Sequence, residues 1–350
     1  MSAIRRKRIL FIGGSLNQTS MMHAIAQHLA HHDCAFTPYY CDGVLERLAK
    51  RGWLDFTVAG TSGPHRARSD AYLRRHGVQI DARGARGGYD LVVTGSDLVV
   101  QRNIRHTRIV LVQEGMTDPE TIMYHVVRRF RLPRWLASTA ATGLSLAYDR
   151  FCVASHGYRD HFVKQGVPAE RIAVTGLPNF DDCARYRHND FPHHGYVLVA
   201  TSDARETFKR DDRQEFLARV ERLARGRPLI FKLHPNEQAD RARIEILSRF
   251  PDALVFADGD TNAMVANCDA LITQYSSVVF VGLALEKECH SYFGMAELRR
   301  RVPIQNGGTS ARRIADECEM LLDSANATPL RLKRRRVPKI PRALRAALAS

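Results

Sequence analysis

Short apolar runs recur along the chain, and most of them end in glycine, serine or threonine. Runs of this length with turn-forming residues at their ends are typical of buried strands, and the longer mixed stretches between them are typical of helices. Strands that alternate with helices form parallel β-α-β units. The pattern predicts an α/β fold with buried strands over residues 8–14, 89–96, 108–115, 151–155, 196–202, 228–233, 253–257 and 270–274.

A polar segment divides these units into two groups. Residues 177–195 contain two prolines and several turn-forming residues, a composition that is typical of a linker. A chain of 350 residues also fits two domains of ordinary size. We therefore expect an N-terminal α/β domain over residues 1–176, a linker over 177–195, a C-terminal α/β domain over 196–328 and a basic tail over 329–350.

Two strands of the second half end in residues that suit a phosphate. Residues 230–236 (Ile-Phe-Lys-Leu-His-Pro-Asn) form an apolar strand that ends in a basic residue, an imidazole and a turn. Residues 270–278 (Ala-Leu-Ile-Thr-Gln-Tyr-Ser-Ser-Val) end in two hydroxyls where a helix should begin. Ligands bind outside the carboxyl ends of strands in an open parallel sheet, and a helix N-terminus capped by serine attracts anions. The expected phosphate or pyrophosphate site consists of Lys232, His234, Pro235, Asn236, Gln274, Ser276 and Ser277.

Lys232 and His234 are two residues apart on one strand, so their side chains should lie on the same face. His234 is expected to contact this phosphate or to protonate it. A solvated lysine at the end of a strand is an equally open interpretation of Lys232. The helix after Ser276 is too apolar for a surface helix, so we expect it to be largely buried.

Glu114 is the candidate acid/base residue of the first half. It follows a buried strand and precedes a glycine, which places it at the carboxyl end of the strand, facing the cleft between the domains. A carboxylate that activates an acceptor hydroxyl needs a pKa near the working pH, and partial burial can supply it. The alternative is that Glu114 caps the loop at residues 117–119. The acceptor side of the cleft is expected to include Gly13, Gly14, Ser15, Gln113 and Gly115.

The chain is strongly basic, with 52 Lys and Arg residues against 37 acids and a net charge of +15. This excess favours anionic partners, although arginines on solvated faces are the alternative. Basic residues cluster over 331–345, and residues 121–135 mix aromatic residues with arginines. We expect the tail to bind an anionic membrane surface or an anionic acceptor. Residues 121–135 have the composition of a segment that lies on an anionic membrane surface, and the alternative is an acceptor-loop helix that packs on its own domain. No nucleic-acid-binding signature is present, so no nucleic-acid partner is expected.

Several kinds of site and location are not supported by the sequence. No apolar run reaches about 18 residues, so no membrane span is expected. The basic residues before the first strand do not precede the apolar core of a signal peptide. The seven cysteines are scattered without a Cys-x-x-Cys pair, which argues for reduced thiols in a cytoplasm and against a zinc site. The Asp-x-Asp sequence at residues 258–260 is interpreted as a turn, and no metal ion is expected.

Several segments resemble those of nucleotide-dependent enzymes with the GT-B fold. Residues 233–235 (Leu-His-Pro) resemble the His-Pro motif of bacterial sialyltransferases and of capsule-polysaccharide transferases that use CMP-Kdo. Residues 272–280 (Ile-Thr-Gln-Tyr-Ser-Ser-Val-Val-Phe) resemble the TDYSS segment of CDP-glycerol glycerophosphotransferases, which also carry Lys-x-His-Pro. Residues 112–115 (Val-Gln-Glu-Gly) resemble the acidic-acidic-Gly motif of the sialyltransferases and a Glu-Ala-Gly segment of UDP-GlcNAc 2-epimerases. The resemblance implies a GT-B fold, in which two Rossmann-like domains face each other across a cleft.

The chain departs from these motifs at three places. Gln274 stands where the TDYSS segment has Asp, and Gln113 stands where the sialyltransferase motif has its first acid. The epimerases would show Ser-Gly-Gly and a pair of glutamates where this chain has residues 277–280 (Ser-Val-Val-Phe). The last departure argues against epimerase chemistry.

The resemblance implies a metal-independent transferase that moves a sugar or a polyol phosphate from a CMP- or CDP-activated donor to a bacterial surface polysaccharide or lipid-linked glycan. The donor would be a substrate, and no cofactor is expected. Two alternatives stay open: a UDP-GlcNAc 2-epimerase-like or UDP-sugar-dependent GT-B enzyme, and a non-catalytic protein that binds anions or nucleic acid. The expected location is the cytoplasm, with peripheral attachment to the cytoplasmic face of the inner membrane through the basic tail.

Overall fold

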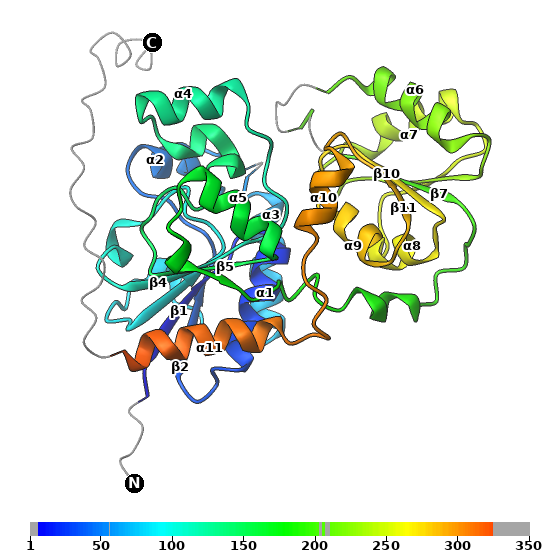
Figure 1. Cartoon of the computed structure of the whole chain (residues 1–350). Helices are drawn as coiled ribbons and strands as arrows, with labels where there is room; N and C mark the ends of the chain where they lie inside the picture. The colour runs from blue at the N-terminus through cyan, green and yellow to red at the C-terminus, as the bar shows by residue number, and fades with distance from the viewer. Residues whose placement is uncertain (1–5, 56, 203–204, 207–210, 325–350) are drawn as a thin grey trace, which may run out of the picture.

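The computed structural model describes residues 6–55, 57–202, 205–206 and 211–324. Its strands form two parallel sheets, which lie in two lobes of the molecule (Figure 1). The basic tail, residues 329–350, lies outside the described residues. Within the described part of the chain, no helix has both the length and the apolar character to cross a membrane.

The first sheet has the strand order β2-β1-β3-β4-β5-β6, and all of its neighbouring strands pair in parallel. Its central strands are buried on both faces, which explains their continuous apolar sequences. The strands are β1 (Arg8–Ile12), β2 (Asp33–Thr37), β3 (Leu91–Thr94), β4 (Arg108–Val112), β5 (Arg150–Val153) and β6 (Ile172–Val174). The α-helices between them are α1 (Leu16–Gln27), α2 (Val44–Lys50), α3 (Pro64–Arg75), α4 (Ile122–Phe130) and α5 (His156–Gln165).

The second sheet has the order β11-β10-β7-β8-β9 and is also parallel throughout. Its strands are β7 (Val197–Ala200), β8 (Leu229–Lys232), β9 (Leu254–Phe256), β10 (Ala270–Thr273) and β11 (Glu288–His290). The α-helices between and after them are α6 (Arg213–Ala224), α7 (Ala239–Arg249), α8 (Thr261–Asn267), α9 (Val278–Ala284), α10 (Met295–Arg301) and α11 (Ser310–Asp323). The helix expected to be buried after Ser276 is α9, and its residues Val279–Val281 are buried, as predicted.

Each sheet has a topological switch point, where the strand order reverses. It lies between β1 and β3 in the first sheet and between β7 and β10 in the second. Loops on the two sides of such a point lead away in opposite directions, so ligands of open α/β sheets bind at the carboxyl ends of those strands. The switch points direct attention to the turn after β1 and to the loops after β7 and β10.

The last helix of the chain returns to the first lobe. α11 packs beside α1 (Figure 1). The Arg150 side chain on β5 forms an ion pair with Glu317 of α11 at 2.8 Å. The predicted C-terminal domain, residues 196–328, included this helix, but its buried face covers the first sheet instead. The amphipathic pattern of α11 predicts that one face is buried and does not say which lobe it covers.

Candidate functional site

The carboxyl ends of the two sheets face each other. A Cβ atom added at Gly115, after β4, would lie 3.4 Å from the Cβ of Ser277, which follows β10. A second contact joins the start of α3 to the loop after β8, where Asn236 Nδ2 lies 3.2 Å from the Nε2 atom of His65. Arg68 of α3 also donates to the carbonyl of Pro235 at 3.3 Å. The structure therefore brings Gly115 of the first half against Ser277 of the second, and the loop after β8 against α3.

Glu114 is half-buried and is held by the first turn of α1. The Ser15 hydroxyl donates to its Oε1 at 2.9 Å, and Gln18 Nε2 donates to its Oε2 at 2.5 Å. Burial raises the pKa of Glu114, and the hydrogen bonds from Ser15 and Gln18 oppose that rise. The alternative role, a cap for residues 117–119, does not match these bonds. The N–H of Asp118 in that loop is instead bonded to Thr139 Oγ1 at 2.8 Å.

Gln18 is a residue that the sequence analysis missed. Ser15 caps α1 by accepting from the Gln18 N–H at 3.2 Å, so residues 15–18 have the Ser-x-x-Gln spacing of a capping box. That spacing is the sequence signal by which Gln18 could have been singled out. In a capping box the Gln18 side chain would return to the N–H of Ser15, but here it donates to Glu114 instead. Gly14 makes this possible, because a Cβ there would lie 1.7 Å from Gln18 Oε1.

Gln113 holds the loop beside Glu114 rather than facing outward. It is buried, its Nε2 donates to the carbonyl of Gly115 at 2.7 Å, and its Oε1 accepts from the Ala154 N–H at 3.0 Å. These bonds fix the loops after β4 and β5 and set the direction of the chain at Glu114. Asp97, in the loop after β3, also has a structural role. Its carboxylate accepts hydrogen bonds from the backbone N–H groups of Gly143 and Ser145.

His234 is half-buried, and its neighbours set its tautomer. The backbone N–H of His234 donates to Thr201 Oγ1 at 3.0 Å. The backbone N–H of Asn236 donates to the ring atom Nδ1 of His234 at 3.2 Å. Because Nδ1 accepts a hydrogen bond, the neutral ring carries its hydrogen on Nε2. His234 can therefore present an N–H donor to an anion without being protonated.

Lys232 is buried and bonded to the backbone. Its ammonium donates to the carbonyls of Leu233 at 3.0 Å and Ala257 at 2.9 Å, and burial lowers its pKa. These bonds join the ends of β8 and β9 and fix the turn that carries His234. The structure contradicts the interpretation of Lys232 as a solvated lysine, and the sequence did not predict this bracing position.

Gln274, Ser276 and Ser277 differ in how they are used. Gln274 is buried, its Nε2 donates to Asp211 at 2.8 Å, and its Oε1 accepts from Ser202 at 2.5 Å. Ser276 and Ser277 are half-buried at the start of α9. The Ser277 hydroxyl makes no capping bond to that helix, which has only seven residues. Any anion site here depends on the two hydroxyls rather than on a long helix dipole.

A buried network of polar and charged side chains holds the backbone at His234 in place. Thr201 Oγ1, which accepts from the His234 N–H, donates to Glu237 Oε2 at 2.5 Å, and Arg213 is paired with the same carboxylate. Burial raises the pKa of Glu237, and Arg213 opposes the rise. No local sequence pattern indicates this network, because its partners lie 24 to 36 positions apart in the chain.

The Asp-x-Asp at residues 258–260 is a turn, as predicted. Asp260 caps α8 by accepting from the Asn262 N–H at 2.8 Å, and Gly259 has a φ of 104° that favours glycine.

No family profile and no curated protein sequence matches this chain. Solved structures do match. A UDP-N-acetylglucosamine 2-epimerase aligns with a TM-score of 0.54 and 12% sequence identity, over 93% of this chain and 99% of that one. The UDP-GlcNAc 2-epimerase from Neisseria meningitidis bound to UDP-GlcNAc aligns with a TM-score of 0.53 and 10% identity, over 89% and 100% of the two chains. A variant of the wall teichoic acid polymerase TagF aligns with a TM-score of 0.46 and 12% identity, over 91% and 89%.

At these identities the likeness shows the fold alone. Together with the two parallel sheets, it confirms the predicted fold class: the chain has a GT-B fold, with two Rossmann-like α/β lobes whose carboxyl strand ends face each other.

Proposed function

We propose that the protein is a group-transferring enzyme that uses a nucleotide-activated donor. The nucleotide would bind the second lobe at the carboxyl ends of β7, β8 and β10, and the acceptor would bind the first lobe beside Glu114. One observation carries the proposal: Gly115, next to Glu114, packs against Ser277. A base on the first lobe and phosphate ligands on the second would thus meet around one reacting group.

The chemistry follows from the groups on the two sides. Glu114 would remove the proton from an acceptor hydroxyl, whose oxygen attacks the group to be transferred. The bond to the nucleotide phosphate breaks, and the phosphate leaves with the electron pair. Hydrogen bonds from His234 Nε2 and from the hydroxyls of Ser276 and Ser277 would stabilise that charge. In this proposal these donors act without a metal ion, and the raised pKa of Glu114 suits a base that works near neutral pH.

The finer proposal is a CMP- or CDP-activated donor, carrying a sugar or a polyol phosphate, and a bacterial envelope glycan or lipid-linked acceptor. It rests on the resemblance of residues 233–235 and 272–280 to enzymes that use such donors. A UDP-sugar-dependent enzyme is the second candidate, because one matching epimerase structure was bound to UDP-GlcNAc. Epimerisation itself is less favoured, since residues 277–280 lack the expected Ser-Gly-Gly.

Nucleotide titration tests this proposal. CMP, CDP and UDP would each be titrated against the melting temperature of the full chain, which rises when a ligand binds the folded state. We expect a larger rise with CMP or CDP than with UDP. A rise with UDP alone would replace the cytidine proposal by the second candidate, and no rise with any nucleotide would contradict the function.

The double variant Ser276→Ala, Ser277→Ala tests the phosphate site. Loss of two hydroxyl donors to a charged phosphate should weaken nucleotide affinity by about 1–3 kcal/mol. Ser248→Ala, an exposed serine on α7 in the same lobe, is the matched control and should bind as the wild type does. Unchanged affinity in the double variant would remove both hydroxyls from the site.

We also propose that the protein works at an anionic membrane surface. Two aromatic residues and an isoleucine on and after α4 are exposed: Ile122 (85%), Phe130 (63%) and Trp135 (42%). The exposed arginines Arg128 and Arg129 lie on the same helix, whereas Tyr124 and Val127 bury its other face. Exposed apolar side chains beside basic ones suit an interface of acidic headgroups.

Vesicle binding tests this location. The tail over residues 331–345 has eight Lys or Arg residues and no acid, and each is worth about 1 kcal/mol near an anionic surface. We expect salt-sensitive binding to anionic vesicles and not to neutral ones, lost when residues 331–350 are removed and weakened in Ile122→Gln, Phe130→Gln. Nucleotide binding should survive both changes. Equal vesicle binding by the full and shortened chains would assign the charge of the tail to another anion, such as the acceptor.

A further inference from the structure

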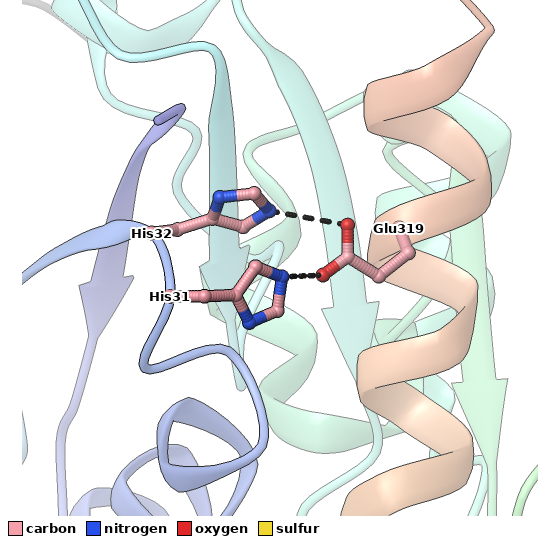
Figure 2. A group of neighbouring side chains, drawn as sticks. All are labelled: His31, His32 and Glu319. Atoms are coloured by element: carbon pink, nitrogen blue, oxygen red, sulfur yellow. Dashed lines mark hydrogen bonds and ion pairs between the residues drawn. The ribbon is translucent and has the colours of Figure 1, made fainter. Parts of the chain in front are cut away.

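We propose that His31, His32 and Glu319 bind one divalent transition-metal ion of the Zn²⁺ class and so join the last helix to the first lobe. His31 and His32 lie between α1 and β2, and Glu319 lies on α11. Figure 2 shows both imidazoles pointing toward the two oxygens of the carboxylate. This site is separate from the proposed group-transfer site.

The ligand atoms are already close together. Glu319 Oε1 lies 2.8 Å from His31 Nε2, and Glu319 Oε2 lies 3.1 Å from His32 Nε2. One ligand atom from each residue lies within 4.8 Å of the others, and the two imidazole centroids are 4.2 Å apart. Ligands held about 2.0–2.2 Å from one tetrahedral zinc are roughly 3–4 Å from one another. Small side-chain rotations would therefore make room for an ion.

The carboxylate has an unmet acceptor. Glu319 Oε1 is buried and receives no hydrogen bond from the residues that the structure describes, although His31 Nε2 is near it. A buried oxygen without a donor costs free energy. An ion between the imidazoles and the carboxylate would supply the missing partner.

His32 must change its tautomer to bind. The ring is buried, and its Nδ1 accepts from the Lys7 N–H at a long 3.4 Å, so the neutral ring carries its hydrogen on Nε2. Coordination through Nε2 moves this hydrogen to Nδ1 and gives up the bond from Lys7. The ring keeps one proton throughout. The lost hydrogen bond makes the site weaker than a preformed structural zinc site. The hydrogen must leave Nε2 before the ion can bind there, but this requirement does not prevent binding.

The donor set indicates the class of ion. Two imidazole nitrogens and one carboxylate suit zinc and neighbouring transition metals, whereas Mg²⁺ and Ca²⁺ prefer oxygen ligands. Cys34 follows the histidines closely in sequence, but its thiol donates to the carbonyl of Leu29 at 3.4 Å, and the cluster of close ligand atoms consists of His31, His32 and Glu319. We therefore leave Cys34 out of the ligand set.

The ion would stabilise the folded chain, because its ligands come from opposite ends of the sequence. His32 and Glu319 are 287 residues apart, so a shared ion closes nearly the whole chain. α11 already contacts α1 and pairs with β5 through Glu317. An ion that binds only this folded arrangement raises the melting temperature by mass action.

The test uses the full chain after removal of metal by a chelator. Zn²⁺ would be titrated by calorimetry and by melting temperature, with Co²⁺ as a visible-absorption probe and Mg²⁺ as the negative control. We expect a Zn²⁺ site that raises the melting temperature by several degrees and gives a Co²⁺ d–d band. His31→Ala and Glu319→Gln should lose that site, whereas His106→Ala, an exposed histidine of the same lobe, should keep it.

Both test variants should remain folded without metal, because His31 is exposed and glutamine preserves the shape of Glu319. Their melting temperatures without metal check this directly. Zn²⁺ binding that persists in both variants, or no binding by the wild type at millimolar Zn²⁺, would overturn the proposal.

Discussion

Replacing Glu114 with glutamine is expected to lower turnover by about 100- to 10,000-fold, the contribution that general acid–base groups usually make. The amide has the shape of the carboxylate but cannot take a proton from the acceptor. Donor affinity should stay near that of the wild type, because the nucleotide is proposed to bind the second lobe. Steady-state rates and nucleotide titration measure the two effects separately.

The same variant should not melt at a lower temperature. Burial raises the pKa of Glu114 in the folded state, so its protonated form folds more favourably than its ionised form. That advantage is present at low pH and is lost as the pH rises through the folded pKa. At neutral pH a neutral amide avoids the cost of the buried charge. Loss of turnover with an unchanged or higher melting temperature would thus separate catalysis from folding.

Ser15→Ala supplies the pH control for Glu114. The Ser15 hydroxyl donates to the carboxylate at 2.9 Å and opposes the rise in its pKa. A hydrogen bond to a charged group is worth about 1.5–3 kcal/mol, and about 1.4 kcal/mol corresponds to one pKa unit. Because the base must be ionised, the acidic limb of the kcat profile should move up by about one unit or more. Near-native turnover in Glu114→Gln would instead make Glu114 a positioning residue for α1.

Replacing His234 with alanine is expected to lower turnover by about 100- to 1,000-fold and to weaken donor binding as well. The ring is proposed to donate from Nε2 to the departing phosphate, and loss of one such donor usually costs this much. The joint loss distinguishes His234 from Glu114, whose replacement should spare the nucleotide. Rates and nucleotide affinity are measured on the same preparations.

Two variants control for the fold around His234. His234→Gln keeps an N–H donor and should recover part of the lost turnover. His290→Ala, which removes an imidazole from β11 in the same sheet, should behave as the wild type does. Donor affinity that is unchanged in His234→Ala would exclude the ring from the phosphate site.

The sequence predicted the central architecture because central strands are buried on both faces. β3, β4, β7 and β10 each consist mainly of buried apolar residues, and each was recognised from its continuous apolar run. The sequence pattern did not predict β2, β6 and β11, which all lie at sheet edges. β2 and β11 carry polar residues such as Asp33 and Glu288, and β6 has only three residues. An edge strand has less apolar surface to bury, so its pattern is weaker.

Candidate residues followed from the same logic. Glu114, His234 and Ser277 each follow a recognisable strand within a few residues, and parallel strands bring their carboxyl ends to one edge. The contact between Gly115 and Ser277 agrees with that expectation. The chemical role of each side chain is a separate matter, and the variants above test it.

Long-range partners came only from the tertiary structure. The sequence around Lys232 does not indicate that its ammonium donates hydrogen bonds to the carbonyls of Leu233 and Ala257. The sequence around Gln18 likewise does not indicate that its side chain donates to Glu114. The packing of α11 on the first lobe, and with it the approach of Glu319 to the histidines, has the same origin. The pattern of apolar and polar residues in an element shows which of its faces is buried, and this pattern can be read from the sequence. The partner that covers the face depends on how distant elements pack, and the folded arrangement alone decides it.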